Sequence, residues 1–99
     1  MDRRMLKQLE DMKKKMEKAQ NDLANETVVG SAGGGAVTIE MNGHHEVKSV
    51  KIDPEALDPE DVETLQDMML TAFNQALEKA QELANQKMSA ATGGLNLPF

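Results

Sequence analysis

Basic side chains are concentrated in the first eighteen residues of this 99-residue chain, although the chain as a whole is acidic. Residues 1–20 carry a net charge of +3 and residues 21–99 a net charge of −9, which together give the formal −6. A local cluster of positive charge, rather than the net charge, attracts a polyanion to a protein surface. The cluster consists of Arg3, Arg4, Lys7, Lys13, Lys14, Lys15 and Lys18. It predicts a binding site for a polyanion such as nucleic acid.

A helix over residues 1–25 would arrange most of these cations on one outer stripe, whereas Lys13 and Lys15 would flank the apolar seam and could pair with acidic residues across an interface. Apolar residues recur at alternating spacings of four and three, which is the pattern of a heptad seam. The seam consists of Met5, Leu9, Met12, Met16, Ala19 and Leu23. Lys7 and Lys14 fall on the side of the helix opposite this seam. We therefore predict phosphate contacts from the outer stripe. The predicted contact residues are Arg3, Arg4, Lys7, Lys14 and Lys18.

Two other uses of this helix stay open at this stage. The charged stripe can be a solvated face, because Glu10 and Lys14, like Asp11 and Lys15, are spaced for local ion pairs. Alternatively, the Met-rich seam can bind another protein, since Met side chains adapt to varied apolar surfaces. The two binding hypotheses differ in salt dependence, because only the basic stripe acts through charge.

A three-stranded antiparallel sheet is predicted over residues 27–52. Apolar and polar residues alternate in its central strand, whose inward side chains would be Val37, Ile39 and Met41. Asn42-Gly43 then suits a type I′ hairpin turn. The return strand runs from about residue 45 to 52. Within it, Val47 and Val50 are three residues apart, which breaks the alternation and indicates a bulge.

A long second helix is predicted over residues 59–90. Asp58 would be its N-cap and Pro59 its first residue, and a tail over residues 93–99 would follow it. Its predicted buried residues are Val62, Leu65, Met69, Ala72, Phe73, Ala76, Leu77, Ala80, Leu83 and Met88. We thus expect one α+β domain, residues 1–99, with an N-terminal helix, a three-stranded antiparallel sheet and a long C-terminal helix.

The composition favours a homodimer. The chain has two Phe and neither Trp nor Tyr, so its core must be built from aliphatic and Met side chains. A single small core of this kind gives little stability, and pairing with a second copy would add buried apolar area. We expect the sheet region and part of the second helix to form the interface.

The sequence gives little support for other kinds of site. It contains no Cys, which excludes disulfides and thiol chemistry. His44 and His45 are adjacent, so in a strand their rings would point to opposite faces and could not chelate one metal. The Gly33–Gly35 run is not followed by the helix that a phosphate loop needs. We expect no enzymatic activity, cofactor, metal or membrane span, and a cytoplasmic location.

Several motifs, taken together over nearly the whole chain, resemble the YbaB/EbfC family. They are Met12–Gln20, Gly30-Ser31-Ala32-Gly33-Gly34-Gly35, Asn42-Gly43, Ile52-Asp53-Pro54, Asp58-Pro59-Glu60-Asp61-Val62-Glu63, Thr92-Gly93-Gly94-Leu95 and Leu97-Pro98. The resemblance implies a bacterial nucleoid-associated protein that binds duplex DNA as a homodimer. It implies roles in nucleoid organisation, gene regulation or DNA repair.

The resemblance also implies how the site is arranged. Helices would project from the body of the dimer in a tweezer-like arrangement, so the basic stripe of the first helix would meet DNA. If the helices converge, Lys79 and Lys87 of the second helix are secondary DNA-binding candidates. Such proteins are often encoded near recombination-repair genes. Recombination or replication factors are therefore the partners expected in the protein-interaction alternative.

Overall fold

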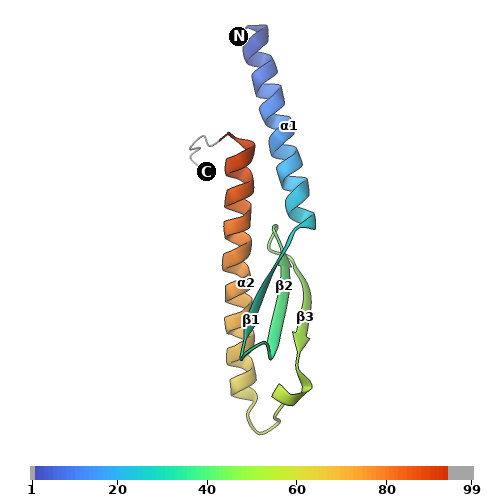
Figure 1. Ribbon diagram of the computed structural model, residues 1–99, viewed down its shortest axis with the longest axis vertical. Helices are drawn as coiled ribbons and strands as arrows, with labels where there is room; N and C mark the ends of the chain where they lie inside the picture. The colour runs from blue at the N-terminus through green and yellow to red at the C-terminus, as the bar shows by residue number, and fades with distance from the viewer. Residues whose placement is uncertain (1, 94–99) are drawn as a thin grey trace.

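The structure is a computed structural model that describes residues 2–93. Along these residues run α1 (Arg3–Asn25), β1 (Thr27–Ala32), β2 (Val37–Asn42), β3 (Val47–Ile52), the short 3-10 helix η1 (Pro54–Ala56) and α2 (Val62–Ala91) (Figure 1). The strands form one antiparallel sheet in the order β1-β2-β3. The predicted α+β fold of helix, three-stranded antiparallel sheet and long helix is confirmed.

The contact between α2 and the sheet is unusually close. A stripe of small residues four apart on α2 is fully buried against the strands; the stripe is Ala72, Ala76 and Ala80. Val37, Ile39 and Met41 of β2 complete this core. A Cβ added to Gly30 of β1 would overlap the backbone oxygen of Ala72 and lie 2.5 Å from the backbone nitrogen of Ala76. Gly30 is therefore required because the helix backbone approaches the strand backbone there.

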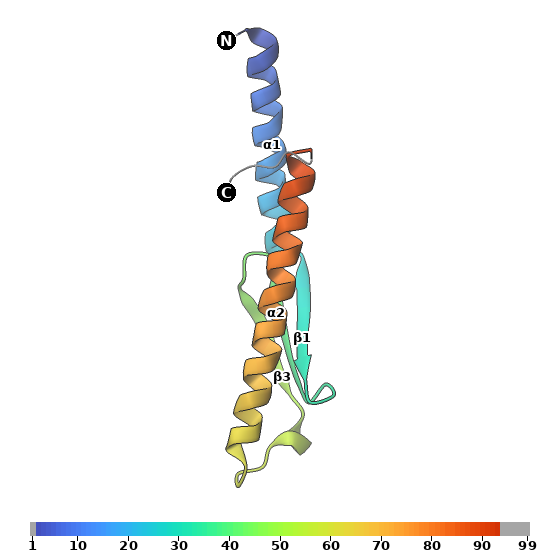
Figure 2. The same cartoon turned by 90° about the vertical axis from the view of Figure 1, so that its left-hand side faces the viewer.

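Two side chains of α2 also bond the outer edge of β1. Gln75 Oε1 accepts a hydrogen bond from the Ser31 N–H at 2.8 Å, and Lys79 Nζ donates to the Val29 carbonyl at 2.9 Å. Unpaired strand edges can accept a strand from another chain. These two bonds occupy part of the β1 edge, and α2 lies along this side of the molecule (Figure 2).

β3 contains the bulge that the spacing of its valines predicted. Glu40 pairs with Ser49 and Met41 pairs with Val47, so Lys48 is an extra residue without a counterpart in β2. Because of this extra residue, Val47 and Val50 line the same groove although they are three apart. The bulge prediction is confirmed.

The turn between β2 and β3 is not the predicted type I′ turn. That turn needs positive φ at both Asn42 and Gly43, but in this hairpin the residue with positive φ is His45, at 66°. The His45 N–H donates to the Asn42 carbonyl at 3.1 Å, and the Asn42 N–H donates to the Glu46 carbonyl at 2.9 Å. This geometry matches a three-residue loop, in which a type I turn is followed by one left-handed residue.

α2 begins at Val62, three residues later than predicted. Its N-cap is Asp61, whose carboxylate accepts from the Thr64 N–H at 3.3 Å and the Thr64 hydroxyl at 2.7 Å. Asp58 instead stabilises a preceding turn, in which its carboxylate accepts from the Glu60 N–H at 2.9 Å. Asp58 and Asp61 are three residues apart, and either is a suitable N-cap by residue type. Of the predicted tail, residues 94–99 lie outside the part that the structure describes.

An open apolar groove of 550 Å³ runs between β3 and α2, because α2 packs mainly over β1 and β2. It is lined by Ile39, Val47, Val50, Ile52, Leu65, Gln66, Met69, Leu70 and Phe73. We call this surface the β3–α2 groove. The predicted burial of Val62 and Phe73 is wrong for the single chain, in which they are 51% and 39% exposed. Both lie off the buried Ala stripe, on the open side of α2.

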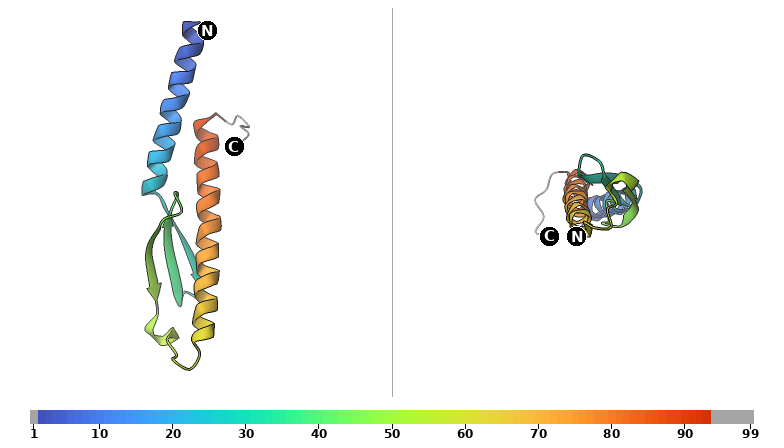
Figure 3. Two further views of the ribbon diagram at one scale, coloured as in Figure 1. Left: turned by 180° about the vertical axis from the view of Figure 1, so that it is seen from behind. Right: turned by 90° about the horizontal axis from the view of Figure 1, so that it is seen from below.

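α1 packs on the rest of the molecule through its C-terminal half. Ala19 and Leu23 are its buried residues, and Gln20 Nε2 lies 3.4 Å from Met88 Sδ of α2. The N-terminal part runs past the end of α2 (Figures 1 and 3). The radius of gyration is 18.9 Å, whereas about 13 Å is typical of a compact domain of this size. We call residues 3–18 the α1 arm.

The close contact between Gly30 and α2 predicts a large effect of a small substitution. Gly30→Ala should lower the free energy of unfolding by about 3 kcal/mol, because the new methyl group meets backbone atoms that cannot move aside. Asn85→Ala, on the exposed side of α2, should change it by less than about 0.5 kcal/mol. Urea unfolding at equal protein concentration measures both, and equal stability of Gly30→Ala and the parent would contradict this packing.

Candidate nucleic-acid interface

The α1 arm is a continuous helix without Gly, Pro or β-branched residues, which favours a straight and regular helix. Asp2 caps it, because its carboxylate accepts a hydrogen bond from the Met5 N–H at 2.8 Å. With a rise of about 1.5 Å per residue, Arg3 and Lys18 are about 22 Å apart along the axis. The arm is therefore long enough to follow several phosphates of a nucleic acid strand.

All seven basic side chains of the arm are exposed. Among residues 2–93, one ion pair has its charged atoms within 4 Å, and it joins Lys87 to Glu26. No basic residue of the arm forms such a pair within this part of the chain. The local pairs Glu10–Lys14 and Asp11–Lys15, which a purely solvating face would favour, are thus not formed. The cations keep their hydrogen-bond donors free for an anionic partner.

Positive and negative charge are separated along the long axis of the molecule, which is 69 Å. Seven acidic residues and no basic ones lie between Asp53 and Asp67. This segment joins β3 to α2 at the end of the molecule opposite the tip of the arm (Figure 1). Interactions between exposed charges are screened over about 10 Å at 0.1 M salt. The acidic segment is therefore too distant to neutralise the arm.

Lys79 and Lys87, the secondary candidates, are engaged in contacts within the chain. Lys79 donates to the Val29 carbonyl at 2.9 Å. Lys87 Nζ lies 2.7 Å from Glu26 Oε1, and this hydrogen bond raises the pKa of Lys87 above its ordinary value. A phosphate would have to compete with these contacts, so both lysines stay secondary candidates.

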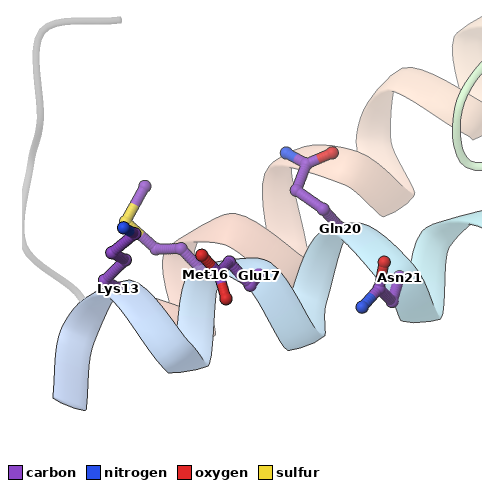
Figure 4. A pocket seen from close by; sticks show the side chains of 5 residues that line it. All are labelled: Lys13, Met16, Glu17, Gln20 and Asn21. Atoms are coloured by element: carbon purple, nitrogen blue, oxygen red, sulfur yellow. The ribbon is translucent and has the colours of Figure 1, made fainter. Parts of the chain in front are cut away.

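The apolar seam of α1 is buried at one end and exposed at the other. Ala19 and Leu23 are buried and Met16 is half-buried, whereas Met5 and Leu9 are 51% and 50% exposed. An open hollow of 480 Å³ beside Met16 is lined by Lys13, Met16, Glu17, Gln20 and Asn21 (Figure 4). All five lining residues belong to α1, so the hollow is an open face of one helix rather than an enclosed site.

The C-terminal end of α1 is capped by the β2–β3 hairpin. The last carbonyls of a helix have no partners within the helix and must find them elsewhere. The Gly43 N–H donates to the Leu23 carbonyl at 2.8 Å and to the Glu26 carbonyl at 3.1 Å. A Cβ on Gly43 would lie 2.8 Å from Leu23 Cβ. Gly43 is therefore required for its close approach to α1, rather than for the turn.

Asn42 connects this hairpin loop to the helix and is fully buried. Its Nδ2 donates to the Ala24 carbonyl at 3.2 Å and to Glu46 Oε1 at 2.9 Å. Its Oδ1 accepts from the His44 and Glu46 N–H groups at 2.9 and 3.0 Å. The bond from Asn42 lowers the pKa of the Glu46 carboxyl, and the charge of Lys48 lowers it further.

His44 takes part in the same contact. Its Nε2 lies 2.7 Å from the Gln20 carbonyl oxygen, so this nitrogen must carry the proton and donate it.

Within residues 2–93, no three His, Asp or Glu side chains gather as a metal site would require. Nor do these residues include a helix long and apolar enough to cross a membrane.

Comparison with known proteins identifies the family of this chain. The sequence model of the YbaB/EbfC DNA-binding family matches residues 1–95. The chain belongs to this family. A relative in Chloroflexus aurantiacus described as a nucleoid-associated protein is 52% identical, over 94% of this chain and 93% of the relative. In Pelotomaculum thermopropionicum the identity is again 52%, over 96% of this chain and 90% of the relative.

The YbaB/EbfC fold is also found in a solved structure. The crystal structure of an uncharacterised protein from Helicobacter pylori matches this one with a TM-score of 0.72 and 31% identity. The match covers 91% of this chain and 94% of that protein. The helix–sheet–helix arrangement that positions the arm therefore occurs in both molecules.

Sequence reasoning located the basic stripe of this YbaB/EbfC chain but missed the residues at the base of the arm. Asn42 and Gly43 were interpreted as turn residues, and His44 was considered only as a metal ligand. Their contacts with Leu23, Ala24 and Gln20 span about twenty residues of sequence, so no local spacing indicates them. One indication was available in the sequence. Asn42, a polar residue, ends a strand whose inward residues are apolar, and a polar residue that becomes buried there needs a hydrogen-bond partner.

The hydrogen bond between Asn42 and Glu46 predicts a change in titration. Because this bond lowers the pKa of Glu46, the stabilisation it gives is present at neutral pH and is lost as the pH falls through the folded-state pKa. Asn42→Ala should raise the pKa of Glu46 towards its ordinary value, and Lys48→Met should raise it less. Carboxyl NMR titration measures both, with circular dichroism to verify folding. An unchanged Glu46 titration in Asn42→Ala would contradict the assigned cause.

Proposed function

We propose that this protein binds duplex DNA as a homodimer, mainly through phosphate contacts from the α1 arm, within the bacterial nucleoid. The observation that carries this proposal is the arm itself, which projects from the body with exposed cations that lack acidic partners. Membership of a DNA-binding family supports DNA as the polyanion. The proposed contact residues are Arg3, Arg4, Lys7, Lys14 and Lys18.

The chemistry of the arm favours the backbone of a duplex over other nucleic acids. Lys and Arg contacts to phosphates position a protein on DNA without reading its sequence. Proteins that bind single strands usually stack bases on aromatic side chains. This chain has two Phe residues, and Phe73 lies in the β3–α2 groove, away from the arm. We therefore infer binding to duplex DNA with little sequence preference.

A homodimer is supported by the β3–α2 groove. Eight of its nine lining residues are apolar, and Val50, Leu70 and Phe73 are 45%, 61% and 39% exposed in the single chain. The buried core is small, with three Ala residues among the six that form its main cluster. A two-fold interface would use the same groove on both subunits and bury its apolar surface. We propose a second copy as its occupant.

Dimerisation would also bring two arms into one molecule. Five cations on each arm give at most about 10 phosphate contacts per dimer, which is enough for useful affinity although each contact is weak. A protein that holds duplex DNA by its backbone at two places can organise the nucleoid, and in doing so affect gene regulation or DNA repair. We propose these roles on that basis.

A second candidate function rests on the exposed end of the apolar seam. Met5 and Leu9 of the seam are 51% and 50% exposed, and the neighbouring Leu6 is 47% exposed. Apolar side chains in a row on a projecting helix can bind another protein, such as a recombination or replication factor. This function would depend on the seam rather than on the basic stripe, and salt would weaken it little.

Charge reversal on the arm tests the DNA site. The parent dimer should show a log–log salt slope of about −4 to −5, because acidic neighbours offset part of the maximum of about −9 for ten contacts. Lys7→Glu/Lys14→Glu should weaken duplex binding at least tenfold at 50 mM salt and flatten this slope, since attraction becomes repulsion. Both positions are exposed, and Glu is nearly as good a helix former as Lys.

The matched control reverses the same number of charges elsewhere. Lys48→Glu/Lys51→Glu changes two exposed lysines of β3 and should retain most of the affinity. Mobility-shift titrations at two salt concentrations, with circular dichroism on each preparation, compare the variants. Equal binding by the arm variant and the parent would exclude the arm as the DNA site.

A charge in the groove tests the dimer. Phe73→Glu should convert the dimer to a folded monomer at low micromolar concentration, because a carboxylate would be buried without a partner at the interface. Asn85→Glu, on the exposed side of α2 away from the groove, should remain dimeric. Sedimentation velocity measures both variants. A parent protein that sediments as a stable folded monomer would refute the dimer.

A further inference from the structure

The direction of the α1 arm is determined at its base. One residue, Glu26, separates the last residue of α1 from the first residue of β1. From Leu23 to Arg3 the helix extends about 30 Å. Tilting it by 10° at the base would therefore move its tip by about 5 Å. Whatever holds the base controls where the cations of the arm lie.

α2 contacts this base through the Gln20–Met88 contact and the Lys87–Glu26 ion pair, and three consecutive residues of the hairpin bond the helix carbonyls there. Gly43 donates its N–H to the Leu23 carbonyl, Asn42 donates its amide to the Ala24 carbonyl, and the His44 ring contacts the Gln20 carbonyl. These carbonyls belong to the last two turns of α1, so the contacts act on the axis of the helix. We call residues 42–44 the hairpin clasp.

Asn42 is the rigid part of the clasp. Asn42 is fully buried and both polar atoms of its amide are hydrogen-bonded, so its donor to Ala24 has one orientation. A wrong orientation would leave buried polar groups without partners, which costs about 1–3 kcal/mol per group. Gly43 sets how closely the hairpin approaches, because a side chain there would meet Leu23.

We propose that the hairpin clasp sets the orientation of the α1 arm, and that Asn42 and His44 are positioning residues for DNA binding. This inference rests on the proposed function of the arm. In the proposed dimer, the clasp determines the separation of the two basic stripes and therefore which phosphates both arms can reach together. None of the three residues needs to touch DNA.

The orientation of the arm can be measured directly. The chain has no Cys, so Gln8→Cys on the arm and Glu78→Cys on α2, both at exposed positions, provide two specific spin labels. Dilution of labelled protein with excess unlabelled protein makes pulsed electron paramagnetic resonance report the distance within one subunit. Thermal unfolding and duplex binding are measured on the same variants.

The variants have distinct expected results. Asn42→Ala should broaden the distance distribution, because the donor to the Ala24 carbonyl is lost, and should weaken duplex binding about threefold to tenfold, because the arm is less well preorganised. Gly43→Ala should shift the mean distance, because it pushes Leu23 away. His44→Ala changes an exposed position, so it should fold and have a smaller effect in the same direction as Asn42→Ala. His44→Gln should restore the parent distribution, since its amide can donate to Gln20.

The control is His45→Asn, which removes the neighbouring imidazole and tolerates the left-handed conformation at this position. It should leave both distance and affinity unchanged. Distance distributions of Asn42→Ala, Gly43→Ala and His44→Ala that match the parent would overturn the proposal. So would a broadened distribution with unchanged duplex affinity. Failure of the proposed DNA site is a separate result. It would be shown if Lys7→Glu/Lys14→Glu bound DNA like the parent while its arm distance stayed unchanged.

Discussion

The close contact of α2 with β1 and β2 determines the rest of the molecule. Gly30 and the Ala72, Ala76 and Ala80 stripe let the helix backbone approach one side of the sheet. Because α2 is drawn to that side, it leaves Val47 and Val50 of β3 half exposed. The same placement carries the end of α2 beyond the sheet, where it packs against the C-terminal half of α1 and leaves the arm projecting.

The distribution of charge follows this elongated shape. An acidic chain repels DNA on average, yet a repulsive charge matters only within about a Debye length of the contact. With an axis of 69 Å, the molecule holds its acidic Asp53–Asp67 segment at the opposite end from the arm. In a compact fold of the same composition, with a radius of gyration of about 13 Å, the two charge clusters would face each other more closely. The elongated shape therefore separates the basic and acidic clusters by more than the range of screened charge interactions.

Local patterns predicted the elements well where a single periodicity prevailed. The absence of Gly, Pro and β-branched residues from Arg3 to Asn25 favours a helix in any surroundings, and the valine spacing of β3 indicated its bulge. Predictions were wrong where the local sequence allows more than one cap or turn. Asp58 and Asp61 are both good N-caps, and Asn42-Gly43 suits a type I′ turn in isolation. In the hairpin, the choice depends on a residue that is remote in sequence, because the Gly43 N–H is donated to the Leu23 carbonyl.

The sequence alone determined the order of the elements, the concentration of cations on one helix and the family resemblance, because these depend on residue types at short spacings. Tertiary structure decided which apolar residues stay exposed, and it assigned Phe73 and Val62 to the open side of α2. It also placed Asn42 and Gly43, which were predicted only as turn residues, and His44, which was considered only as a metal ligand, against the end of α1 as a cap. The physical reason is that helix-end carbonyls and apolar faces need partners, and only the folded chain determines which distant groups are close enough to supply them.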